Sequence, residues 1–136
     1  MRHLRLAAVA LLVLPPAIVA AATPTWSTAT ATSVTAGVTS KSTFRIVAQV
    51  TLPQQCDMAR IRTLAITSQL HRSFIVEQMP PGTICTQKAV YTCTVESPNF
   101  QLPIPHKFDV KTKGKTWSVP LSMESPHPMP PMCAKG

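Results

Sequence analysis

Residues 43–52 read Thr-Phe-Arg-Ile-Val-Ala-Gln-Val-Thr-Leu, and an apolar side chain occupies every second position of this segment. The alternating apolar set is Phe44, Ile46, Ala48, Val50 and Leu52. A period of two places all five side chains on one face of a β-strand. Pro53 follows directly and ends the pattern. The segment therefore predicts a strand with one face in a hydrophobic core.

Further short apolar runs follow, separated by turn residues, and no segment shows a convincing helical stripe. The nearest to a helix is 57–70, but its β-branched content argues for extended structure. Gly114 can take the positive φ of a tight turn, so 108–121 predicts a hairpin. Pro103 and Pro105 indicate an edge strand or an extended loop. This rhythm predicts an all-β fold, a single antiparallel β-sandwich over 43–121.

The first 22 residues have the order of a secretory signal, which would be helical. Arg2 and Arg5 precede an apolar run, and Ala20 to Ala22 supply small residues before a cut at Thr23. The run is short for a membrane span, although an uncleaved anchor is the alternative. We expect a secreted or periplasmic protein with no transmembrane segment after cleavage. Residues 23–42, rich in Thr, Ser and Ala, fit either a flexible leader or an edge strand.

The charge and the cysteine content of the exported part indicate a basic protein with disulfide bonds. The chain holds thirteen Lys and Arg residues, and without Arg2 and Arg5 eleven face five Asp and Glu, a net charge of about +6. Four cysteines remain in the exported part: Cys56, Cys85, Cys93 and Cys133. An even number in an exported chain indicates two disulfides, and the residues by themselves permit three connectivities.

The order of these features resembles small exported bacterial proteins with an immunoglobulin-like or fibronectin-like sandwich. The features are a strand before Cys56, the triplet Cys85-Thr86-Gln87 after a Pro/Gly turn, and a terminal hairpin with Lys-Gly at its tip. The resemblance implies a bond between Cys56 and Cys85. Elimination then predicts that Cys93 pairs with Cys133 and holds the Pro-rich tail, 122–136, on the sandwich.

Four lysines surround the predicted hairpin tip and form the first candidate binding site. They are Lys107, Lys111, Lys113 and Lys115. Since residues two apart on a strand share a face, the last three are expected to project together and to bind an anionic envelope polymer. The alternative is that they block edge-to-edge aggregation. Nucleic acid is excluded as a partner because no aromatic residues interleave with these lysines.

The tail carries the second candidate site, a soft-metal centre. Its ligands would be Met123, His127, Met129 and Met132, with Cys133 if that thiol were free. Thioether and imidazole groups suit Cu(I), while methionine as apolar filler is the alternative. No cofactor other than this copper is expected.

Catalysis is not expected. No Gly-x-Ser-x-Gly motif occurs, and no pair of acids lies in a sugar-binding pattern. The sequence thus predicts a non-catalytic binding or structural domain whose partner is a protein or an anionic envelope polymer. A copper-binding protein is the alternative.

Overall fold

The computed structural model describes residues 10–16, 25–68, 71–82, 84–104, 107–123 and 130–135. These residues form strands and no helix, which confirms the all-β class. None of them therefore forms a helix that could cross a membrane. The strands are β1 (Ser27–Thr28), β2 (Thr30–Val38), β3 (Thr43–Leu52), β4 (Met58–Ser68), β5 (His71–Met79), β6 (Tyr91–Glu96), β7 (Phe100–Gln101), β8 (Lys107–Thr112), β9 (Lys115–Ser122) and β10 (Ala134–Lys135).

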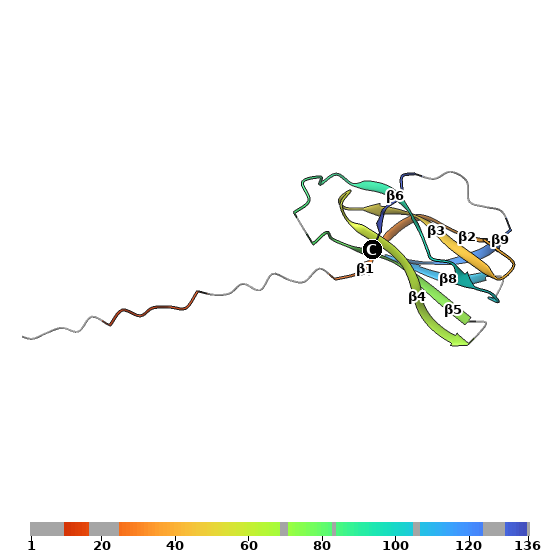
Figure 1. The fold of residues 1–136 in the computed structure, drawn as a ribbon, viewed down its shortest axis with the longest axis horizontal. Helices are drawn as coiled ribbons and strands as arrows, with labels where there is room; N and C mark the ends of the chain where they lie inside the picture. Colours follow the sequence, from red (N-terminus) through yellow and green to blue (C-terminus); the bar gives the residue numbers. More distant parts are fainter. Residues whose placement is uncertain are drawn as a thin grey trace, which may run out of the picture.

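The strands of the described residues join in one curled sheet, drawn in Figure 1. Its order is β10-β4-β5-β8-β9-β2-β3-β6, while β1 pairs with β5 and β7 pairs with β3. The two ends of this order are β10 and β6, and β4, the neighbour of β10, lies close to β6. The sheet is consequently almost closed, in the manner of a barrel, around a single core.

The expectation of a wholly antiparallel sheet is wrong, because the sheet is mixed. β2 runs parallel to β9, β5 to β8, and β10 to β4. Hairpin neighbours such as β4 and β5 or β8 and β9 are antiparallel, since a short turn reverses the chain. The parallel neighbours are far apart in the sequence. A long connection allows two paired strands to run either parallel or antiparallel.

The predicted strand of 43–52 is confirmed as β3. All five side chains of its alternating set have no exposed surface. Phe44 lies at the centre of a phenyl cluster, with ring centroids 5.9 Å from Phe74, 5.6 Å from Phe100 and 5.5 Å from Phe108. Four phenyl rings from four strands therefore hold the two sides of the curled sheet together, and truncating one such ring to Ala costs about 3–5 kcal/mol.

The segment 23–42 is neither a leader nor an edge strand where the structure describes it. β2 pairs with β3 on one side and with β9 on the other. Val34 and Ala36 of β2 are buried in the core. The domain therefore begins well before residue 43, and the predicted boundary is wrong by at least the length of β2.

The predicted hairpin is confirmed as β8 and β9. Thr112 pairs with Lys115, and Gly114 at the turn has a φ of 74°. Phe108, Val110 and Val119 are buried in the core. Because a shift by one residue would expose these side chains, their burial fixes the register of the hairpin.

Both disulfide pairings are confirmed: Cys56 bonds to Cys85, and Cys93 bonds to Cys133. Such bonds form and persist in oxidising compartments, which fits an extracytoplasmic location. Cys93 and Cys133 are buried, whereas Cys56 and Cys85 join two loops near the surface.

Residues 130–135 of the tail close the gap between β6 and β4, and we call them the closing segment. Thr94 of β6 donates its backbone N–H to the Pro131 carbonyl and accepts a bond from the Cys133 N–H. The Thr94 hydroxyl also donates to the carbonyl of Pro130. Ala134 and Lys135 then pair with Met58 and Ala59 of β4. Residues 130–135 of the tail are therefore part of the folded domain.

The double substitution Cys93→Ala/Cys133→Ala should release the closing segment. The bond closes a loop with a sequence separation of 40 residues, so its loss should lower the free energy of unfolding by about 4 kcal/mol. Urea unfolding measures that loss, and hydrogen exchange should show faster exchange of the Thr94 amide. An unfolding free energy within about 1 kcal/mol of the parent would show that the bond does not hold the closure.

Candidate functional site

The lysines of the hairpin do not share one face. Lys107 and Lys111 alternate with the buried Phe108 and Val110, so both point outward from β8. Lys115 pairs with the buried Thr112, and its ammonium lies 3.6 Å from the centre of the Trp117 ring. The prediction that Lys111, Lys113 and Lys115 project together is wrong. The two-residue turn at Lys113 and Gly114 places Lys115 opposite Thr112, on the other face from Lys111.

Outward side chains from neighbouring strands extend the surface around Lys107 and Lys111. Arg62 of β4 and Lys111 of β8 both stand opposite Ile75 of β5, so the three form one row across the sheet. His71 of β5 lies exposed and lines the same cavity as Lys107. We call Arg62, His71, Lys107 and Lys111 the basic face.

A cavity of about 290 Å³ lies on this face. Its lining residues are Ala65, Thr67, His71, Arg72, Ser73, Lys107, Phe108 and Asp109. Ser73 and Asp109 stand directly opposite each other on the parallel strands β5 and β8. The cavity thus combines an imidazole, an ammonium group and hydroxyls, which can all donate hydrogen bonds to an anion.

Ser73, His71 and Asp109 are also the residue types of a hydrolytic triad. Among the hydrogen bonds of the described residues, none joins these three side chains, and His71 accepts one from Thr67 through its backbone carbonyl. The expectation that the protein is not an enzyme stays a prediction.

Two arginines enclose Glu77 beside the basic face. The Nη2 of Arg62 donates to Glu77 at 2.7 Å and the Nε of Arg60 at 2.9 Å. The hydrogen bond from Arg62 holds the pKa of Glu77 below its ordinary value, against the effect of burial, and Arg60 lowers it further. The Arg60 guanidinium also lies 3.8 Å from the centre of the Trp26 ring, which fixes the chain just before β1.

The described acids leave most of the lysines without an acidic neighbour. Glu77 and Glu96 are held by arginines, and Asp57 is buried. Asp109, which has no ion pair with an arginine among the described residues, is exposed and lies between Lys107 and Lys111 on the outer face of β8.

The proposed copper ligands fall only partly within the described residues. His127 and Met129 lie outside them, while Met123 and Met132 are exposed. Cys133 is bonded to Cys93, so its sulfur is not a thiolate ligand. Among the residues that the structure describes, no three His, Cys, Asp or Glu side chains gather in a way that could hold a metal ion. The copper site stays a prediction.

Sequence reasoning missed the arginine pair and the tryptophan. Arg60 and Arg62 are two residues apart, a spacing that places both on one face of a strand, and this signal could have been found. Their contacts with Trp26 and Glu77 join segments that are distant in the sequence, so no local sequence pattern predicts them.

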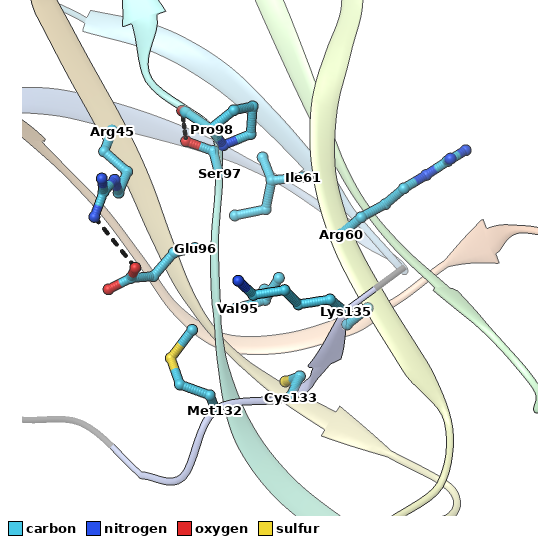
Figure 2. Close-up of a pocket in the computed structure, with 11 residues that line it drawn as sticks. Arg45, Arg60, Ile61, Val95, Glu96, Ser97, Pro98, Met132, Cys133 and Lys135 are labelled. Atoms are coloured by element: carbon cyan, nitrogen blue, oxygen red, sulfur yellow. Dashed lines mark hydrogen bonds and ion pairs between the residues drawn. The ribbon is translucent and has the colours of Figure 1, made fainter.

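A second cavity, of about 350 Å³, lies where β4 and β6 approach each other, and we call it the seam groove. Its lining residues are Arg45, Ala59, Arg60, Ile61, Val95, Glu96, Ser97, Pro98, Met132, Cys133 and Lys135, most of which are labelled in Figure 2. Sequence reasoning missed this groove, because its walls come from four separate segments.

Comparison with protein-family models, with curated proteins and with solved structures found no match to this chain. The function is therefore argued from the chain's own residues.

Glu77→Gln should destabilise the protein in a pH-dependent way. Because the folded pKa of Glu77 is lowered, its ion pairs stabilise the fold above the ordinary pKa of 4.5, and this contribution disappears as the pH falls through the lower folded value. We expect a loss of about 1–3 kcal/mol at pH 7, discounted for the half-exposed arginines. Denaturant unfolding across pH 2–7 measures it. A loss that stays constant over this range would contradict the ion-pair account.

Asp57→Asn should have the opposite effect. Asp57 is buried, and its Oδ1 has no hydrogen-bond partner among the described residues. Burial raises the pKa of this carboxyl, partly offset by a hydrogen bond from backbone near Gln54. The charged form therefore destabilises the fold above the raised pKa, and the uncharged amide should increase the unfolding free energy by about 1–3 kcal/mol at pH 7. The gain should disappear below about pH 4, and a less stable variant at neutral pH would refute it.

Proposed function

We propose that this chain is an exported, non-catalytic domain that binds an anionic polymer of the cell envelope through the basic face. The position of β8 within the sheet supports this most directly. The alternative is that Lys107 and Lys111 guard a sheet edge, but over Asp109, Val110 and Lys111 the strand β8 pairs with β5 on one side and with β9 on the other. Lys111 therefore does not lie on an open edge and is not needed there to block strand addition, whereas Lys107 lies beyond the residues that pair with β5.

The spacing of the charges suits a long anion with regularly placed groups. Neighbouring strands are about 4.8 Å apart, which puts Arg62 and Lys111 about 10 Å apart across Ile75. Lys107 and Lys111 are four residues apart on one strand, a distance of about 13 Å. A phosphate-rich or carboxylate-rich polymer could contact Arg62, Lys107 and Lys111 at once, whereas a single small anion could not bridge these distances.

Export rests on two independent features. The first 22 residues have the order of a secretory signal, and the two disulfides suit an oxidising compartment. The fold proposal is that the curled sheet is related to the immunoglobulin-like or fibronectin-like sandwich. The core between its two sides and the hairpin β8–β9 support this relation, and the parallel neighbours depart from it.

The double substitution Lys107→Gln/Lys111→Gln should weaken binding to an anionic polymer. Teichoic acid and lipopolysaccharide immobilised on beads serve as probes, and retention is measured as the salt concentration needed for release. Because each exposed contact acts over a Debye length of roughly 8 Å at physiological salt, removing two should lower that concentration.

The matched control is Lys41→Gln/Lys88→Gln, which removes the same charge from two exposed loop positions. This control should be released at nearly the same salt concentration as the parent. Equal losses in the two double variants would reduce the binding to net charge and contradict a site on the basic face.

A further inference from the structure

The hairpin of β4 and β5 extends past the strands beside it. β5 pairs with β8 from Ser73 to Ile75, so among the described residues His71 and Arg72 at the start of β5 have no paired residue on β8. Over residues 64–68, β4 pairs with β5 alone in the described part of the chain. Figure 1 shows this part of the hairpin leading away from the other strands. We call the described residues 64–68, 71 and 72 the hairpin end.

Two large apolar side chains of the hairpin end are exposed. Leu64 is 41% exposed and Ile66 is 64% exposed, whereas Ala59 and Ile61, earlier on the same strand, are each 3% exposed. The residues around them carry no charge, because 63–70 read Thr-Leu-Ala-Ile-Thr-Ser-Gln-Leu. Removing this apolar surface from water is favourable, so the hairpin end gains free energy when it enters an apolar environment.

Cations lie beside these apolar side chains. Arg72 stands opposite Ile66, and its Nη1 donates at 2.9 Å to the backbone carbonyl of Gln101, which is a neutral partner. Lys107 lines the same cavity as Arg72 and Ala65. Within the described residues, no acid forms an ion pair with Arg72 or Lys107. Both charges are therefore available to an external anion.

Acids are few on this part of the sheet. The sequence has no Asp or Glu from Met58 to Val76. Glu77 lies toward the opposite end of β5 and is held by two arginines, while Asp109 of β8 lines the cavity. With one carboxylate against the ammonium of Lys107 and the guanidinium of Arg72, the surroundings of the hairpin end keep a positive charge.

The small size of the apolar surface favours a bilayer over a protein as the partner. A stable protein interface buries about 800 Å² on each side with a matching shape, and two side chains at the end of a hairpin do not supply that area. A bilayer needs no matching shape, and apolar groups enter its surface by about 5–10 Å. Arg62 lies four residues before Ile66, about 13 Å along the strand, so an upright hairpin places it at the headgroups when Ile66 is inserted.

We propose that the hairpin end inserts Leu64 and Ile66 into the surface of a lipid bilayer that carries anionic headgroups. Arg62, Arg72 and Lys107 then lie at the level of the headgroups and contact their phosphates. The ligand is the bilayer itself. It differs from the envelope polymer of the proposed function, for which no apolar contact is needed.

The test uses the oxidised protein and vesicles of phosphatidylglycerol and phosphatidylcholine in equal parts, with the bound fraction measured by sedimentation. Leu64→Ser/Ile66→Ser should lower the partition coefficient at least about tenfold. The matched control Ile84→Ser/Val90→Ser removes two loop side chains that are 96% and 73% exposed, and should leave the coefficient unchanged. No binding of the parent, or equal losses in the two variants, would overturn the proposal.

The lipid composition tests the role of the cations. Because each Lys or Arg near an anionic surface is attracted to it, vesicles of phosphatidylcholine alone should bind the parent at least about tenfold more weakly. Equal binding to both kinds of vesicle would contradict the assigned role of Arg62, Arg72 and Lys107.

A gain-of-binding variant does not depend on tolerance of the serine substitutions. Ile66→Trp should bind the anionic vesicles more tightly and shift its fluorescence emission to shorter wavelength when they are added, since indole is favoured at the membrane interface. Ile84→Trp should show neither effect. A shift in Ile84→Trp alone, or in neither variant, would place the contact elsewhere and overturn the proposal.

Teichoic acid beads separate this inference from the proposed function. Leu64→Ser/Ile66→Ser should be released from them at the parental salt concentration, because neither side chain belongs to the basic face. Polymer retention without vesicle binding would refute the bilayer proposal alone, and vesicle binding without polymer retention would refute the proposed function alone. A variant that lost both would show that the substitution disturbs the fold around the basic face, and would contradict a separate insertion site.

Discussion

The closure of the curled sheet by residues 130–135 is the constraint on which the rest of the structure depends. A sheet that curls until its two ends approach must satisfy the backbone groups of both end strands. The closing segment bonds to β6 at Thr94 and pairs with β4 at Met58 and Ala59, and the Cys93–Cys133 bond fixes it there. Without this segment, β4 and β6 would both present long open edges to solvent.

The placement of the acids determines the electrostatic character of the surface. Glu77 is buried beneath Arg60 and Arg62, where it accepts hydrogen bonds from both guanidinium groups and connects β4 to β5. Glu96 holds Arg45 between β6 and β3. The arginines thereby contribute largely to internal ion pairs, and the lysines of β8 remain available to an external anion. Replacing lysine by arginine on β8 would not be equivalent, since a guanidinium binds carboxylate with two parallel bonds.

The parts that the sequence predicted are those that local periodicity encodes. The alternating side chains of 43–52 specified β3 and its buried face, and Gly114 specified the hairpin turn. β2 was missed as an internal strand because its Thr, Ser and Ala residues show weak amphipathic contrast, and its burial comes from pairing with β3 and β9. The closing segment has no periodicity at all, because it has only six residues, of which three are proline or follow a proline directly.

The candidate sites were less predictable than the fold, and for a related reason. The charge cluster at 107–115 can be seen in the sequence. The face on which each lysine lies depends on the length of the turn, and the turn places Lys115 on the face opposite to Lys111, with its ammonium over the Trp117 ring. Arg62 joins Lys111 only through the register of three strands, two of which are parallel neighbours. The seam groove depends on where a segment at the end of the chain leaves β6, a long-range property.

β4 connects the basic face to the seam groove through the alternation of its side chains. Arg60 and Arg62 point toward Glu77 on the outer surface, while Ala59 and Ile61 point inward and line the seam groove. Since Arg62 is also part of the basic face, the geometry of that face depends on the regular part of β4, residues 60–63. The irregularity after Thr63 ends this dependence, because beyond it β4 changes register with β5 and its side chains no longer alternate with the same faces.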